Sequence, residues 1–196
     1  MNKREFITAA ALGSVVLPTL AATQKPASGA RRPALLTVTG AIGNHNRGPF
    51  DPVLDQLMKK HNVKFDKAHT FDFDAIAAMP SITIKPTLEY DGKPHALSGP
   101  LLADVIRATG ALANDKVKLL LRAIDGYAVL MPLAEVRRLR FIVAARLDGS
   151  PIPLGGLGPL WAIHDADRIP DIAAKPLAER FANCPWGMYH IEVQQG

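Results

Sequence analysis

The chain has 196 residues, of which 48% are hydrophobic, 21% charged and 6% aromatic, with a single cysteine. This composition excludes extended disorder, a disulfide scaffold and a metal site built from several cysteines, and the length favours one folded domain. The formal net charge is +5, but no stretch interleaves basic with aromatic residues, so the sequence does not indicate a nucleic-acid-binding surface.

Residues 1–22 have the pattern of a signal peptide: a short basic start, an apolar stretch too short to span a bilayer, and small residues at its end. We therefore expect cleavage, no membrane span afterwards and a periplasmic location. An uncleaved anchor and a plain N-terminal helix are the alternatives. Lys3-Arg4 also resembles a twin-arginine export signal, so the export route stays open. Polar, Pro-containing residues 23–33 predict a flexible linker, and one domain is expected over residues 34–196.

The domain is expected to be α+β, with mixed or mainly antiparallel sheets and inserted helices, because the predicted strands and helices do not alternate regularly. Apolar or β-branched runs bounded by turn residues predict strands at Leu35–Thr39, Ser81–Lys85, Leu88–Lys93, Val117–Ile124, Tyr127–Met131, Phe141–Leu147, Ser150–Leu154, Leu160–Ile163 and Met188–Val193. Apolar residues at helical spacing predict helices from Asp51 to Met58, Thr70 to Met79, Gly99 to Gly110, and after Pro132.

The sequence contains no strong catalytic or metal-binding motif. No two histidines have helical ligand spacing. His164-Asp165-Ala166-Asp167 is interpreted as a solvated turn and not as a cluster of metal ligands. There is no Gly-x-Ser-x-Gly, and Cys184 is expected to be a half-buried, unreactive thiol. The Gly-rich loop at 154–159 favours a simple chain turn, although its backbone also suits close approach of a flat ring or an anion.

Several segments, in order, resemble one family. They are Leu35–Gly40, Leu97–Gly110, Arg122–Tyr127, Ala144–Ile152, Gly158-Pro159-Leu160-Trp161 and Tyr189–Val193. This set resembles the sulfite-oxidase-type molybdopterin-binding domain over nearly all of residues 35–193. The resemblance implies an α+β fold of mixed sheets that holds a pterin–molybdenum cofactor, with a Cys thiolate on the metal. The position implied for that Cys lies within Ser81–Glu89, which contains none.

The chain is more similar to a short, exported branch of this family that lacks the Cys. That resemblance implies a periplasmic protein that binds a small pterin without molybdenum and signals to an inner-membrane cyclic-di-GMP signalling protein. Lys85-Pro86-Thr87 stands where that branch tends to have Thr-Pro-Trp. His164-Asp165 replaces a Tyr-Pro pair, and Gly155 or Gly156 replaces an Arg.

A pterin is flat and edged with hydrogen-bond donors and acceptors, so its site needs an aromatic face and a carboxylate. Trp161 or Tyr127 would stack and Asp125 would accept from the ring edge, whereas Lys85 or Arg122 would meet a phosphate or carbonyl. Residue type alone favours the core interpretation of Trp161 and Tyr127 over stacking on a ligand. The complete set of candidate ligand-binding residues is Lys85, Pro86, Thr87, Arg122, Asp125, Tyr127, Gly158, Pro159 and Trp161.

These observations favour an exported, non-catalytic pterin-binding protein that acts as a sensor or carrier. The alternative is a molybdopterin-dependent oxidoreductase of the sulfite oxidase or methionine sulfoxide reductase type. A third hypothesis is an interaction domain without a ligand. On the first hypothesis, substituting Asp125 or Trp161 with Ala weakens ligand binding and leaves the fold intact.

Overall fold

A computed structural model describes residues 32–112, 114 and 116–195 of the chain. The predicted signal peptide and most of the predicted linker lie outside the described residues. The described linker residues, Arg32 and Pro33, are exposed, and Arg32 forms an ion pair with Asp74 at 2.6 Å. No helix in the described part of the chain is long and apolar enough to cross a membrane.

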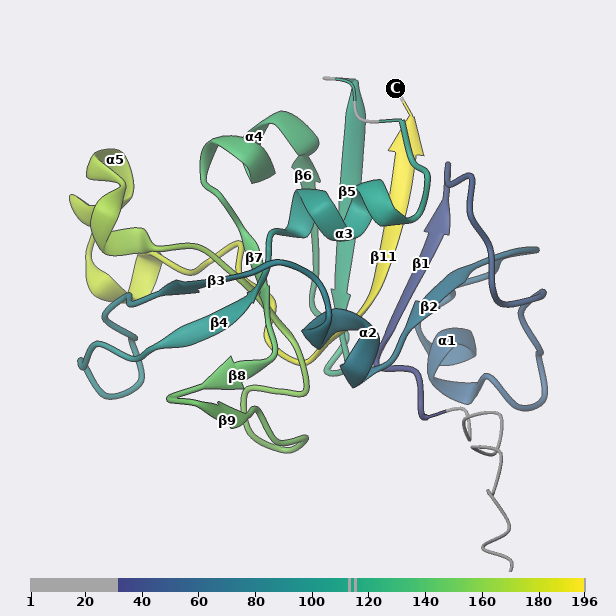
Figure 1. Cartoon of the computed structure of the whole chain (residues 1–196), viewed down its shortest axis with the longest axis horizontal. Helices are drawn as coiled ribbons and strands as arrows, with labels where there is room; N and C mark the ends of the chain where they lie inside the picture. Colours follow the sequence, from purple (N-terminus) through teal and green to yellow (C-terminus); the bar gives the residue numbers. More distant parts are fainter. Residues whose placement is uncertain (1–31, 113, 115, 196) are drawn as a thin grey trace, which may run out of the picture. The chain divides into compact units, whose positions relative to one another are not determined.

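A five-stranded mixed sheet forms the centre of the fold, in the order β2-β1-β11-β5-β6 (Figure 1). Its strands are β1 (Leu36–Gly40), β2 (His69–Phe71), β5 (Val117–Ala123), β6 (Ala128–Pro132) and β11 (Met188–Gln195). β1 and β11 are parallel, with Thr37 opposite His190, and the other neighbouring pairs are antiparallel. The chain is therefore α+β with a mixed sheet, which confirms the expected fold class.

Two smaller sheets pack beside the central one. The first has the order β3-β4-β8-β9, and its strands are β3 (Ser81–Ile84), β4 (Leu97–Pro100), β8 (Arg146–Leu147) and β9 (Ser150–Pro151). The second pairs β7 (Ile142–Ala144) with β10 (Trp161–Ile163). Gly99 of β4 lies so close to β7 that an added Cβ would stand 1.9 Å from the Val143 carbonyl oxygen, so only glycine fits there.

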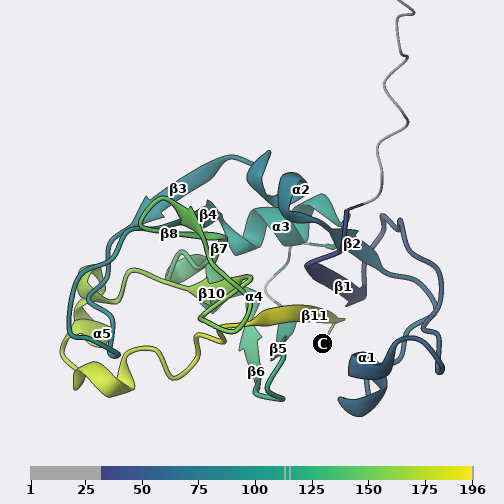
Figure 2. The same cartoon turned by 90° about the horizontal axis from the view of Figure 1, so that it is seen from below.

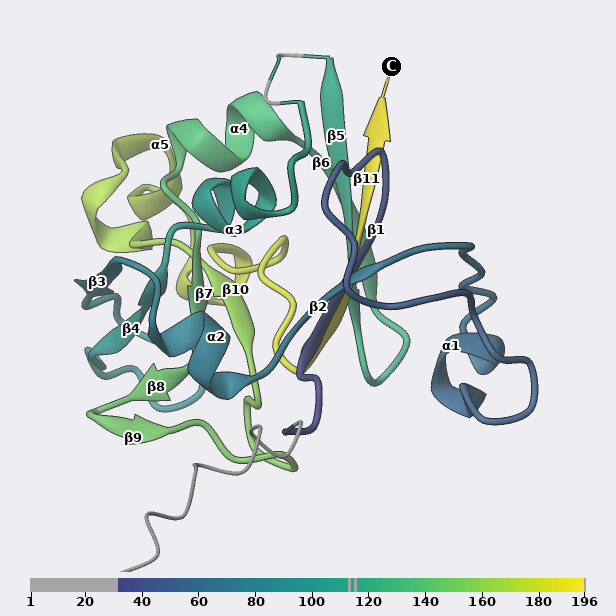
Figure 3. The same ribbon diagram turned by 45° about the vertical axis from the view of Figure 1, so that its right-hand side comes forward.

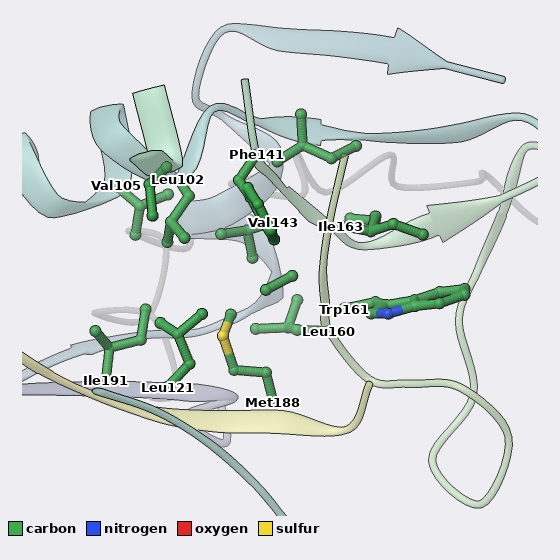
Figure 4. Close-up of a cluster of buried hydrophobic side chains, with 14 of the residues drawn as sticks. Leu102, Val105, Leu121, Phe141, Val143, Leu160, Trp161, Ile163, Met188 and Ile191 are labelled. Carbon is green, nitrogen blue, oxygen red and sulfur yellow. The ribbon is translucent and has the colours of Figure 1, made fainter. Parts of the chain in front are cut away.

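Alternating burial explains why the central sheet has one core-facing side. In β5, Val117, Leu119 and Leu121 are fully buried, whereas Lys118 between them is exposed. These side chains join those of the helices and of β7 and β10 in one apolar cluster, part of which Figure 4 shows. Burial of this cluster provides the main stabilisation of the fold.

Short helices cover the core-facing side of the sheet, as Figures 2 and 3 show for α3. They are α2 (Phe73–Ala77), α3 (Leu102–Ala108) and α4 (Leu133–Arg138). Helix α5 (Pro170–Ala173) and the 3-10 helices η1 (Ala166–Arg168) and η2 (Leu177–Glu179) belong to the segment between β10 and β11, and α5 lies beside β3 in Figure 1. Helix α2 begins at an N-cap, because the Asp72 side chain accepts the Ala75 N–H at 2.8 Å.

The segment containing α1 (Gln56–Lys60) lies on the other side of the central sheet (Figure 3). A second, small apolar cluster of Met58, Val63 and Tyr189 forms there. The sequence pattern predicted a longer helix from Asp51. In the structure α1 starts five residues later, and Val53 and Leu54 are 71% and 79% exposed. The Asp51 side chain accepts the Val53 and Leu54 N–H groups, which makes a separate turn before the helix.

Three further element predictions differ from the structure. Leu88–Lys93 is not a strand: the Leu88 N–H bonds the Lys93 carbonyl, and the Asp91 side chain accepts the Lys93 N–H, which closes a tight loop. The helix predicted from Gly99 begins at Leu102, because Leu97–Pro100 forms strand β4 between β3 and β8. The helix predicted from Thr70 begins at Phe73, because the residues before it pair with β1 as strand β2. Pairing with distant strands decides these two cases, whereas local hydrogen bonds close the Leu88–Lys93 loop.

Candidate functional site

Three of the sequence-predicted ligand-binding residues meet in one cavity of about 220 Å³, which we call the aromatic pocket. Asp125 and Tyr127 come from the β5–β6 turn, and Trp161 begins β10. The remaining lining residues are Glu89, Tyr90, Ala123, Phe181, Ala182, Cys184, Pro185 and Trp186. Four residues of the complete lining are Tyr or Trp, namely Tyr90, Tyr127, Trp161 and Trp186, although aromatic residues make up only 6% of the chain. The aromatic pocket thus concentrates most of the flat, hydrogen-bonding side chains.

The β5–β6 turn fixes Asp125 and Tyr127 at the edge of this pocket. Gly126 supplies the positive φ of +94° that the turn needs, and the Tyr127 N–H donates to Asp125 Oδ1 at 2.9 Å. The Tyr127 hydroxyl donates to the Ala182 carbonyl, which ties the turn to the chain before β11. Asp125 Oδ2 makes no hydrogen bond within the described part of the chain, so this exposed carboxylate keeps an acceptor for a ligand.

Trp161 lies at one end of the apolar cluster in Figure 4 and is only 1% exposed. Its indole N–H donates to the Cys184 carbonyl oxygen at 2.9 Å. The ring therefore borders the aromatic pocket and at the same time belongs to the core. This placement corrects the expectation that Trp161→Ala leaves the fold intact, because the substitution removes a fully buried side chain.

Glu89, Tyr90 and Trp186 lie together in the pocket lining. The centroid of the half-exposed Tyr90 ring lies 6.3 Å from that of Trp161. Burial and the nearby charge of Glu89 raise the pKa of the Tyr90 hydroxyl. The pocket thus brings the loop after β3 next to the segment before β11. Sequence reasoning missed Glu89 and Tyr90, because they precede an Asp-Gly turn that has a purely structural explanation.

Cys184 is the only sulfur that lines the aromatic pocket. Its side chain is buried, and burial raises the pKa of the thiol. The thiol sulfur lies 3.8 Å from Nδ1 of His164, whose own pKa is lowered to about 4 by burial and by the Arg138 charge. Neither group is charged at neutral pH. No group of three or more His, Cys, Asp or Glu side chains in the described part of the chain is placed to hold a metal ion.

Lys85, Pro86 and Thr87 lie outside the aromatic pocket, although the loop that they begin reaches it at Glu89. The Thr87 N–H donates to Asp167 Oδ2 at 2.7 Å. Pro86 is buried and Lys85 is exposed. Asp167, which the sequence analysis placed in a turn, thus fixes the backbone of this loop.

Arg122 projects away from the aromatic pocket, on the side of the central sheet opposite Ala123. Its Nη1 donates to Glu192 Oε2 at 3.0 Å and lies 3.2 Å from Nδ1 of His190. A guanidinium only donates, so Nδ1 accepts, and the opposite ring nitrogen donates to Thr39 Oγ1 at 3.0 Å. Burial and the Arg122 charge lower the pKa of His190 to about 3. Arg122 is therefore committed to a neutral, buried histidine.

Gly158 and Pro159 also lie outside the pocket lining, and the peptide bond between them is cis. A Cβ at Gly158 would lie 2.3 Å from the Ile152 carbonyl oxygen. The close approach that this glycine permits is therefore to the protein's own backbone. The ligand-binding roles of Lys85, Pro86, Thr87, Arg122, Gly158 and Pro159 stay predictions.

Comparison with solved structures finds similarity to the sulfane dehydrogenase SoxCD from Paracoccus pantotrophus, with a TM-score of 0.51 and 11% sequence identity. The match covers 82% of this chain and 38% of the dehydrogenase chain, so this chain spans well under half of that protein. No protein-family model and no curated protein sequence matches the chain. The structural similarity supports a molybdopterin-binding type of fold, in agreement with the coarse part of the sequence resemblance.

Proposed function

We propose that this protein is an exported pterin-binding protein, a sensor or carrier, built on an oxidoreductase-type molybdopterin-binding fold. The observation that carries the proposal is the composition of the aromatic pocket. It combines the rings of Tyr90, Tyr127 and Trp186 with the carboxylates of Glu89 and Asp125. Aromatic faces suit a flat heterocycle, and carboxylates suit the amino and imino donors along a pterin edge.

The same lining residues can be compared with the needs of molybdopterin, the larger cofactor that the family resemblance implies. Molybdopterin carries a phosphate, which needs cationic or N–H donors, but the lining contains two carboxylates and neither Lys nor Arg. Its metal also needs a thiolate, whereas the Cys184 thiol is buried and its pKa is raised. The chemistry of this lining therefore suits an uncharged pterin ring better than molybdopterin, which supports the proposal over the alternative of a molybdopterin-dependent oxidoreductase.

Binding follows from the geometry in two parts. The half-exposed rings of Tyr90 and Trp186 stand at the mouth, where they can pack on a ring that enters. Asp125 Oδ1 is held by the Tyr127 N–H, so the carboxylate is already oriented when its second oxygen accepts from the ligand. A preoriented acceptor lowers the entropy cost of binding.

Export, a periplasmic location and an inner-membrane cyclic-di-GMP signalling partner belong to this proposal on the sequence resemblance and the signal-peptide pattern of residues 1–22. The structural match to a dehydrogenase supports the fold on which the proposal rests. In this role the ligand is bound and released, and its presence is communicated to the partner.

The first test is the content of protein purified from the periplasm of its native host. The protein is denatured without oxidant, and the released material is assayed for pterin by fluorescence and mass spectrometry, with molybdenum measured on the same sample. Stoichiometric pterin without molybdenum supports the proposal. Molybdenum near one atom per chain overturns it.

The second test uses Asp125→Asn, which keeps the shape of the side chain and an acceptor for the Tyr127 N–H. Loss of a charged hydrogen bond is expected to weaken neopterin binding roughly tenfold or more, measured by fluorescence quenching. Asp66→Asn, at an exposed position outside the aromatic pocket, is the matched control. Equal affinities for parent, Asp125→Asn and control would place the site elsewhere.

A further inference from the structure

A second cavity, of about 440 Å³, has the opposite electrostatic character from the aromatic pocket; we call it the arginine pocket. It is bounded by β3, by the end of α4 with the turn after it, and by η1 with the residue that follows. In Figure 1, β3 lies between β4 and α5. The arginine pocket shares no lining residue with the aromatic pocket. Its apolar wall consists of Ile82, Ile84, Leu139 and Ile169.

Three guanidinium groups line this cavity, and they differ in whether they already bind a carboxylate. Arg138 forms a bidentate ion pair with Glu135, because its Nε and Nη2 donate to the two carboxylate oxygens at 2.8 and 2.7 Å. Arg140 and Arg168 are exposed, and neither side chain makes a hydrogen bond or ion pair within the described residues. Each carries a planar fork of N–H donors that matches a carboxylate or phosphate.

Asp165 is the one acidic residue in the lining of this cavity, and its Oδ1 is buried without a partner in the described part of the chain. Because Glu135 balances Arg138, the charges of Arg140 and Arg168 stand against this single carboxyl group. The lining therefore holds more positive than negative charge beside its apolar wall.

Strand β3, the edge strand of its sheet, forms an apolar side of the cavity with Ile82 and Ile84. Sites for small ligands commonly have this composition, an apolar wall with a few polar groups that fix orientation.

From these observations we infer that the arginine pocket binds a small amphiphilic anion, a phosphate or carboxylate attached to an apolar body. Arg140 and Arg168 hold the anionic group, and the wall around Leu139 packs against the body. Because the aromatic pocket is lined by carboxylates and the arginine pocket by arginines, the two cavities select ligands of different charge. The inference does not depend on pterin binding.

The probe is phenyl phosphate, titrated into the full mature protein by calorimetry and by amide shifts in NMR spectra. We expect saturable binding with shifts centred on Thr83 and Leu139. Arg140→Gln and Arg168→Gln are each expected to weaken it roughly fivefold to tenfold, and phenol to bind at least tenfold more weakly than phenyl phosphate. Arg107→Gln is the matched control, since Arg107 is an exposed arginine on α3 that pairs with Asp104 outside this cavity.

Three results would each overturn the inference. The first is no saturable binding of phenyl phosphate by the folded parent protein. The second is unchanged affinity in the Arg140→Gln/Arg168→Gln double variant, with its thermal unfolding confirming the fold. The third is inorganic phosphate binding as tightly as phenyl phosphate, because the apolar wall then contributes nothing. Pterin affinity is measured separately on the same variants and is expected to stay unchanged. This second measurement distinguishes failure of the arginine-pocket inference from failure of the proposed pterin-binding function.

Discussion

Substitution of Trp161 by Phe tests whether this residue is structural. The indole is 1% exposed, and its N–H is the donor to the Cys184 carbonyl oxygen. Phenylalanine keeps an aromatic ring but lacks that donor. Leaving a buried carbonyl without its partner costs about 1–3 kcal/mol, and the smaller ring leaves a void worth roughly another 1 kcal/mol. We therefore expect a loss of about 2–4 kcal/mol in the free energy of unfolding.

In a domain of this size, that loss lowers the melting temperature by roughly 5–12 °C. Urea unfolding, followed by circular dichroism, measures the free energy directly. Trp186→Phe is the matched control, because it makes the same substitution at a tryptophan that is only half-buried. We expect that control to cost less than about 1 kcal/mol. Equal losses in the two variants, or none in Trp161→Phe, would refute the assignment of Trp161 to the core.

Two further predictions concern stability. The pKa of His190 is about 3 in the folded protein, below its ordinary 6.5, so the unfolded chain takes up the proton first and stability falls as the pH drops from 6.5 towards 3. When the free energy of unfolding in urea is plotted against pH, the slope for His190→Gln should be up to about 1.4 kcal/mol per pH unit shallower than the slope for the parent protein. Parallel plots for the two proteins would contradict this. Gly99→Ala should cost about 3 kcal/mol or more, because its Cβ meets backbone, whereas Gly48→Ala, with nothing within 4 Å, should be nearly neutral in the same assay; similar losses would show that β4 can shift.

Local sequence patterns predicted much of the fold. β5 and β11 are long apolar or β-branched runs, and α3 and α4 have apolar residues at helical spacing, so local preference and tertiary packing agree there. The bounds of helix α1 and the presence of strand β4 were harder to predict from local patterns. Val53 and Leu54 have helical spacing but pack against little, and Leu97–Pro100 becomes a strand only because β3 and β8 lie beside it.

The sequence predicted part of the candidate site from residue types and the family resemblance, and not from local periodicity. Asp125, Tyr127 and Trp161 come from two separated segments, and the sequence grouped them through residue type and the family resemblance. No sequence pattern distinguishes a stacking Trp from a buried one, so the burial of Trp161 required the structure. The commitment of Arg122 to His190 and Glu192 likewise depends on the pairing of β5 with β11, which local periodicity does not specify.

The parallel pairing of β1 with β11 has a consequence for how the chain folds. The hydrogen bond between Thr39 and His190 joins residues 151 positions apart, and β11 stands in the middle of the central sheet, between β1 and β5. Closing so long a loop delays the sheet until residues 188–195 are available, so topology makes folding slow. Until then β1 and β5 each present an open edge, to which a strand of another chain can pair.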